Sequence, residues 1–222
     1  MNITIPTSWS DVTLRQYQRI AEIPSLKFED ELDKQIKVLS ILTGIVDDYF
    51  LSVPFSELGK LLSKVGFIYS LPKQSEIKSK INIKGNRYRV NLLPSNLVAG
   101  EYIDLTNLLK DKDKIADNLP DIMAIFLKPV NIFGLKKKGC YKEVEGAMVQ
   151  TLDSRDKTKE LILDGLTMDY VFPISGFFLN LWESLMRVTQ DYSGKQLEKA
   201  MKKINKQVEE MDLPKSTGGT LR

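Results

Sequence analysis

The residues that most often carry catalysis or bind metals are scarce in this chain of 222 residues. It contains no histidine and a single cysteine, Cys140. Without histidine there is no Ser-His or Cys-His nucleophile pair, and the commonest general base and metal ligand is missing. One cysteine without histidine also excludes zinc sites of the finger, knuckle and ribbon types. Cys140 lies near Lys136, Lys137 and Lys138, which can lower a thiol pKa, but we interpret it as an incidental loop cysteine.

Three short motifs approach known signatures and fail at a defining position. Ser70 and Lys73 have the Ser-x-x-Lys spacing of some acyl-transfer enzymes, but a proline between them interrupts the helix that this motif needs. Residues 193–195, Ser-Gly-Lys, lack the upstream glycine and the following Ser or Thr of a phosphate-binding loop. Asp111 and Asp113 start like a calcium loop without its turn glycine and distal glutamate.

Adjacent carboxylates are the remaining route to acid–base chemistry. They occur as the pairs Asp30-Glu31, Asp47-Asp48 and Glu209-Glu210. Neighbouring residues on a helix point in different directions, so we interpret these pairs as solvated helix ends and faces. The sequence therefore predicts a protein that is not an enzyme, with no catalytic residue, no cofactor and no metal ligand.

Composition and charge narrow the class further. Hydrophobic residues make up 42% and charged residues 27% of the chain, as in ordinary globular proteins. The first residues lack the basic start and apolar run of a signal peptide, and the longest apolar stretch, 170–182, is too short to span a bilayer. We therefore expect a soluble protein with no membrane partner.

The net charge of +3 is concentrated at one end of the chain. Residues 195–222 contain seven basic and four acidic residues, so the other basic and acidic residues cancel. A surplus of three is small for a protein that binds a phosphate backbone, which normally presents a strongly basic face. We therefore expect no dedicated nucleic-acid binding. The triplet Lys136, Lys137 and Lys138 is interpreted as a solvated loop tip, although contact with phosphate or an acidic partner stays open.

The periodicity of apolar residues predicts an α+β fold that is mainly α. Helical patterns cover residues 14–21, 28–43, 54–65, 100–109, 114–127, 155–163, 174–188 and 195–211. Thr13 with Gln16 forms a capping box for the first helix, and Gly44 is a stop signal for the second. Alternating residues on both sides of Gly85-Asn86 predict a β-hairpin, which must pack on the helices or pair with another strand such as residues 3–5.

The predicted architecture has two parts. Residues 1–194 form a mainly helical globular domain with a hairpin near 80–91, and residues 195–222 form a long amphipathic helix with an extended tail. Residues 131–146 are expected to form an exposed loop or a second hairpin. The aromatic residues between 170 and 182 are expected to pack in the core rather than to form a binding surface.

The last predicted helix carries a narrow apolar stripe. Its spacing of four, three, four and three residues is that of a coiled-coil seam, formed by Leu197, Met201, Ile204, Val208 and Met211. Two heptads are too short for a free coiled coil, so the stripe must cover either the core of this chain or a partner helix. We predict a partner interface, extended by the apolar-basic end of the tail, Leu221 and Arg222, on an adjacent subunit.

Two segments resemble a group of tailed-bacteriophage proteins. Residues 3–17, Ile-Thr-Ile-Pro-Thr-Ser-Trp-Ser-Asp-Val-Thr-Leu-Arg-Gln-Tyr, are similar to the start of these proteins, and residues 100–105, Gly-Glu-Tyr-Ile-Asp-Leu, to a later segment. The group comprises virion structural proteins and proteins similar to tail-assembly chaperones, including those of the crAss-like podoviruses of gut Bacteroidales. The resemblance covers about the first half of the chain and brings no active site with it.

The resemblance implies a building block or an assembly factor. We expect a ring or connector subunit at the portal–tail junction, forming a homo-oligomeric ring that contacts the portal, the tail or neighbouring ring subunits. Such a protein is assembled in the cytoplasm of the bacterial host and is found in the virion. The alternative is a tail-assembly chaperone that is absent from the mature particle.

Overall fold

The computed structural model describes residues 4–70, 72, 76–93, 96–190, 202 and 206. The fold is α+β and mainly α, as predicted. The chain divides into two compact units, a division that the sequence did not predict within residues 1–194. Unit 1 comprises Met1–Gln74 and Leu163–Phe172, and unit 2 comprises Ser75–Ile162 and Pro173–Arg222. The predicted boundary at 194/195 lies outside the described residues and stays a prediction.

Among the described residues of its N-terminal segment, unit 1 has four α-helices and short 3-10 turns. The α-helices are α1 (Leu14–Ala21), α2 (Glu31–Thr43), α3 (Asp47–Leu51) and α4 (Phe55–Lys64). The 3-10 turns are η1 (Trp9–Asp11), η2 (Ile23–Ser25) and η3 (Gly66–Tyr69). These segments contribute the apolar core of unit 1, which includes Leu14, Leu39, Phe50 and Leu58.

The helix ends of unit 1 follow from local sequence signals. The N–H of Thr13 donates to Gln16 Oε1 over 2.8 Å, which confirms the predicted capping box of α1. Gly44 ends α2 with a φ of 73°, as its stop signal predicted. Two details were wrong: α3, which is only five residues long, was not predicted, and Pro54 is the N-cap of α4 rather than a residue of its first turn.

Residues 163–172 complete unit 1, although they follow most of unit 2 in the chain. The N–H of Leu14 donates to the carbonyl of Leu166 over 3.0 Å, and the N–H of Met168 donates to the carbonyl of Val12 over 2.9 Å. Phe172 also packs edge-on against Trp9, with ring centroids 5.0 Å apart. The two segments of unit 1 are therefore joined by backbone hydrogen bonds and by an aromatic contact.

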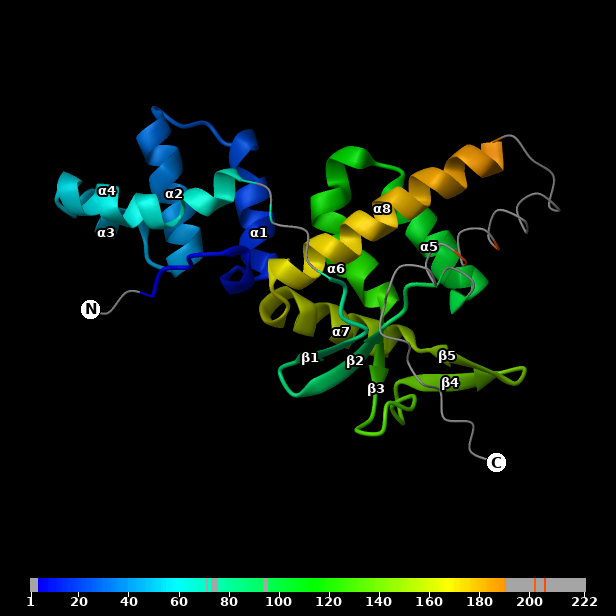
Figure 1. Cartoon of the computed structure of the whole chain (residues 1–222). Helices are drawn as coiled ribbons and strands as arrows, with labels where there is room; N and C mark the ends of the chain where they lie inside the picture. Colours follow the sequence, from blue (N-terminus) through cyan, green and yellow to red (C-terminus); the bar gives the residue numbers. More distant parts are fainter. Residues whose placement is uncertain are drawn as a thin grey trace. The chain divides into compact units, whose positions relative to one another are not determined.

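Unit 2 contains a three-stranded antiparallel sheet in the order β1-β2-β3 (Figure 1). Its strands are β1 (Lys80–Ile83), β2 (Asn86–Val90) and β3 (Leu127–Val130). The predicted hairpin is confirmed, but its turn residues are Lys84 and Gly85, with φ of 47° and 81°, rather than Gly85 and Asn86. The third strand is β3 and not residues 3–5, of which Thr4 and Ile5 are not in a strand.

A second hairpin follows, which was one of the two structures expected for this region. It pairs β4 (Tyr141–Val144) with β5 (Ala147–Gln150), and we call it the ribbon. Glu145 and Gly146 form its turn, both with positive φ. Residues 131–140, which precede the ribbon, form a loop.

The helices of unit 2 are α5 (Ala99–Leu109), α6 (Ile115–Phe126), α7 (Leu152–Gly165) and α8 (Met168–Gln190), with the 3-10 turn η5 (Lys112–Lys114) before α6. The last residues of α7 and the first residues of α8 belong to unit 1. Phe178 is buried and stacks on Phe126, so the prediction of core packing is confirmed for this aromatic residue. Across the described residues, no helix combines the length and the apolar character that crossing a membrane requires.

Candidate functional site: a cleft beside the ribbon

The predicted interface residues cannot be placed on this fold. Leu197, Met201, Ile204, Val208, Met211, Leu221 and Arg222 all lie outside the described residues. Their role in a partner interface stays a prediction. Within the predicted helix 195–211 the structure describes Lys202 and Lys206, both of which are helical.

The paired carboxylates of unit 1 have structural partners. The side chain of Asp30 accepts a hydrogen bond from the N–H of Asp33 over 2.8 Å and so caps α2. Asp47, in the first turn of α3, forms an ion pair with Lys37 over 2.9 Å. The interpretation of these pairs as helix ends is confirmed. Across the described part of the chain, no group of three acidic or cysteine residues is placed to hold a metal ion.

Unit 2 contains a cleft of about 840 Å³ that was not predicted from the sequence, and we call it the ribbon cleft. Its walls come from β2, β3, the loop after β3, the ribbon and the start of α5. The polar residues that line it are Arg89, Asn91, Asn96, Glu101, Lys128, Lys136, Tyr141 and Gln150. The apolar lining residues are Val98, Val130, Phe133, Leu135, Met148 and Val149. A pocket with apolar walls and a few charged groups is the usual form of a binding site.

A buried ion pair lies in the wall of the ribbon cleft. Lys128 on β3 donates to the carboxylate of Glu101 on α5, and the two side chains are 17% and 7% exposed. Gln150 Oε1 is a second acceptor, 3.5 Å from Lys128 Nζ. Burial lowers the pKa of Lys128, and the nearby Glu101 carboxylate opposes this shift. The ammonium is therefore engaged by a carboxylate, a structural arrangement rather than that of a nucleophilic lysine, which needs a free electron pair.

The other charged side chains of the cleft make the wall electropositive. Lys136 Nζ donates to the carbonyl of Met148 over 3.1 Å and lies 5.5 Å from the centre of the Tyr141 ring. Tyr141 donates its hydroxyl proton to the carbonyl of Pro129 over 3.1 Å. The lining includes three cationic residues, with Arg89 as the third beside Lys128 and Lys136, and a single carboxylate. The cleft thus favours a group that carries negative charge.

Residues 131–135, which we call the apolar loop, form one side of the cleft and are held firmly. Asn131 Oδ1 accepts from the N–H of Phe133 over 2.9 Å and from the N–H of Leu135 over 3.0 Å. Two arginines of β2 brace the loop from the sheet: Arg87 donates to the carbonyl of Ile132 over 3.1 Å, and Arg89 donates to the carbonyl of Gly134 over 2.8 Å. The loop conformation is therefore fixed by hydrogen bonds before any partner binds.

This fixed loop displays large apolar side chains to water. Ile132, Phe133 and Leu135 are 68%, 81% and 65% exposed. A cluster of exposed apolar side chains on a rigid support is typical of a protein-binding surface, because little conformational entropy is lost when it docks. The sequence signal was present in the run Asn-Ile-Phe-Gly-Leu, but the pattern alone does not reveal which of these side chains the fold leaves exposed.

Unit 1 has an exposed apolar group of its own. Val46, Leu51 and Phe55, at the two ends of α3 and the start of α4, are 69%, 62% and 78% exposed, and we call them the α3 corner. Asp48 and Glu57 are exposed acidic residues in the same stretch of chain. The α3 corner therefore combines apolar and acidic side chains.

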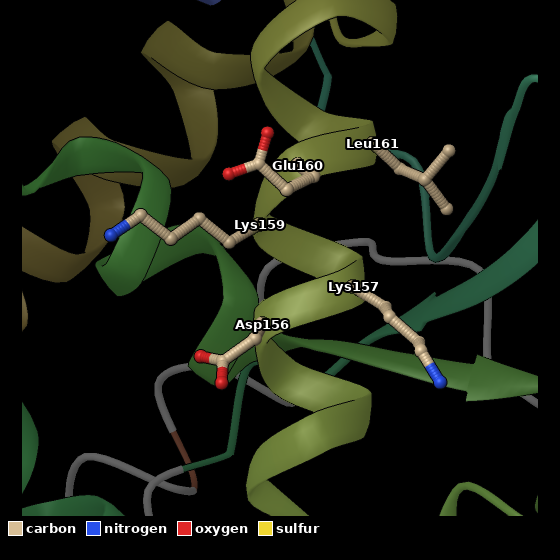
Figure 2. Close-up of a pocket in the computed structure, with 5 residues that line it drawn as sticks. All are labelled: Asp156, Lys157, Lys159, Glu160 and Leu161. Carbon is tan, nitrogen blue, oxygen red and sulfur yellow. The ribbon is translucent and has the colours of Figure 1, made fainter.

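A hollow on α7 does not have the geometry of a site. Asp156, Lys157, Lys159, Glu160 and Leu161 line it, and Figure 2 shows that they point to different sides of the helix. Lys157 pairs with Asp153 over 2.8 Å, and Lys159 pairs with Asp121 over 2.7 Å. The two lysines are therefore engaged in ion pairs, and the five side chains do not converge on a common point.

Comparison with protein-family models, curated proteins and solved structures gives no significant match to this chain.

Proposed function

We propose that this chain is a non-enzymatic, protein-binding component of a tailed bacteriophage, with the role of a ring or connector subunit at the portal–tail junction. The observation that carries the proposal is the apolar loop, whose large side chains are exposed although hydrogen bonds fix their backbone. The exposed ring of Phe133 is hydrated unfavourably in the free protein, so covering it with a partner lowers the free energy of the complex.

The site chemistry supports binding rather than turnover. In the ribbon cleft the lysine with a lowered pKa is bound to a carboxylate, and the tyrosine hydroxyl is donated to a backbone carbonyl. The residues 3–17 and 100–105 that resemble phage proteins supply the biological setting of the proposal. The partners in this setting are the portal, the tail or neighbouring copies in a ring.

Incorporation into particles tests the proposal. We expect the wild-type chain in purified particles at a constant ratio to the portal protein, as measured by quantitative mass spectrometry. Phe133→Asp should abolish incorporation because it places a charge where the partner covers an aromatic ring. Ile103→Asp is the matched control, since Ile103 is also an exposed apolar residue of unit 2 and does not line the cleft, and this variant should be incorporated normally.

A tail-assembly chaperone is the second candidate, and the open cleft next to the apolar loop favours it, because an extended segment of a client protein could bind there. A chaperone predicts that the wild-type chain is absent from mature particles but co-purifies with a tail precursor, and that Phe133→Asp abolishes this co-purification. Absence of the wild-type chain from both fractions would contradict both functions.

A further inference from the structure

Charge is separated between the two units. Unit 1 contains eight basic and eleven acidic residues, a net charge of −3. Unit 2 contains the other 24 basic and 18 acidic residues, a net charge of +6. The apparent neutrality of residues 1–194 is therefore the sum of an acidic unit and a basic one. Opposite charge on two compact units of one chain favours contacts between unlike units of different copies.

The charged residues beside each exposed apolar group have the same sign as the net charge of the unit that carries the group. The α3 corner of unit 1 is flanked by Asp48 and Glu57. The ribbon cleft of unit 2 has apolar walls and is lined by Arg89, Lys128 and Lys136. An aromatic side chain such as Phe55 fits the apolar lining, and a carboxylate beside it would meet the cationic side chains.

We propose that the α3 corner of one copy docks on the ribbon cleft and apolar loop of a second copy. This proposal rests on the proposed function. In it, the partner that covers the apolar loop is a second copy of the chain. The contact is head to tail, because it joins two different surfaces. A docked pair leaves one corner and one cleft available, so association continues until a ring closes or a filament grows.

A symmetric pairing of like surfaces is disfavoured by the same charges. Corner against corner would bring Asp48 and Glu57 of both copies together, and cleft against cleft would do the same with the cations. Like charges facing one another across an interface cost free energy and select the unlike pairing.

Two variants, each blocked at one surface, test the head-to-tail contact. Phe55→Lys places a cation where the corner would meet the cationic cleft, and Phe133→Asp places an anion where the cleft would meet the acidic corner. Both side chains are highly exposed, so the folds should be retained, with thermal unfolding curves like those of the wild type. In sedimentation velocity the wild type should form oligomers larger than dimers, whereas each variant alone should be monomeric.

Mixing the two variants is decisive. The intact cleft of the Phe55→Lys chain and the intact corner of the Phe133→Asp chain should combine into a one-to-one dimer, and no larger species should form. The double variant Phe55→Lys/Phe133→Asp should stay monomeric, which excludes a new ion pair between the substituted residues. Leu26→Asp and Ile103→Asp are the exposed-site controls for units 1 and 2 and should assemble like the wild type.

Two results would overturn the docking. One is a wild-type chain that stays monomeric up to about 100 µM, a range in which even a micromolar contact is saturated. The other is a Phe55→Lys variant that assembles as well as the wild type. Neither result contradicts the proposed function, which is supported if particles incorporate the wild-type chain but not the Phe133→Asp variant.

Discussion

Lys128 and Glu101 place opposite charges in a wall of the ribbon cleft, where both side chains are largely removed from water. Desolvation of two ions is costly, and their mutual attraction offsets it only while both partners are present. The pair also fixes β3 relative to α5, since Lys128 lies on the strand and Glu101 in the first turn of the helix. The charged state of Lys128 in this wall thus depends on a carboxylate that is 27 positions away in the sequence.

Removing one partner of this pair should destabilise unit 2. For Glu101→Gln we expect the free energy of unfolding to fall by about 3–5 kcal/mol, because the Lys128 ammonium loses its compensating charge. The double variant Glu101→Leu/Lys128→Met should recover most of the loss, since it removes both buried charges. Urea unfolding curves measure both values, and equal losses in the single and double variants would show that packing, rather than charge, dominates.

The buried hydroxyl of Tyr141 should make the free energy of unfolding depend on pH in the alkaline range. Burial raises the pKa of its hydroxyl above the value of about 10 that applies in the unfolded chain. Above that value the unfolded chain releases the proton while the folded chain retains it, so the free energy of unfolding falls as the pH rises. Tyr141→Phe should make this decline shallower and cost about 0.5–1.5 kcal/mol at neutral pH, because the carbonyl of Pro129 loses the hydroxyl donor and keeps the N–H of Lys137.

The comparison is made by urea unfolding at a series of pH values. Tyr88→Phe is an informative companion, because burial raises the pKa of Tyr88 too, and the decline should again become shallower. An unchanged decline in Tyr141→Phe would contradict the assigned cause.

Helices and hairpins differ in how far the sequence could predict them. The capping box at Thr13 and the stop at Gly44 were predicted because each signal lies within a few residues of the helix end that it determines. β3 was missed because its hydrogen bonds come from β2, about 40 residues earlier in the chain. The ribbon cleft was missed for the same reason, since Arg89 in its wall reaches the carbonyl of Gly134 across 45 positions.

Two glycines of unit 1 should respond to the same substitution with opposite signs. Gly59 lies inside α4, and a Cβ at this position would meet no atom within 4 Å. Gly59→Ala should therefore raise the free energy of unfolding by about 0.5–1 kcal/mol. Gly44 is equally unobstructed but has a φ of 73°, so Gly44→Ala should lower it by about 1–2 kcal/mol. Thermal unfolding of both variants checks the signs, and two shifts in the same direction would contradict this account.

The net charge of +3 is the sum of a negative net charge on unit 1 and a larger positive net charge on unit 2. Averaging over the sequence concealed this separation, because residues 163–172 belong with the N-terminal segment and not with their neighbours in the chain. The sequence predicted the fold class, but the division into units depends on contacts that no local pattern encodes.

Charge separation makes assembly sensitive to salt. Raising the salt concentration from about 0.1 M to about 1 M shortens the Debye length from about 10 Å to about 3 Å and screens the attraction between exposed charges. We expect oligomers of the wild-type chain to dissociate over this range, as followed by sedimentation velocity. Oligomers that strengthen with added salt would show that burial of apolar surface alone drives the association.

Residues 163–172 have a consequence for synthesis of the chain on the ribosome. Val12 and Leu14 are fully buried in the finished protein, and their backbone groups bond to Met168 and Leu166. Those partners are translated only after the whole of the sheet and the ribbon has been made. The N-terminal segment therefore cannot bury these apolar side chains against residues 163–172 until the intervening part of unit 2 has been synthesised. During this interval the nascent chain should be a substrate for ribosome-associated folding factors, and translation that stops before Leu163 should leave unit 1 incomplete.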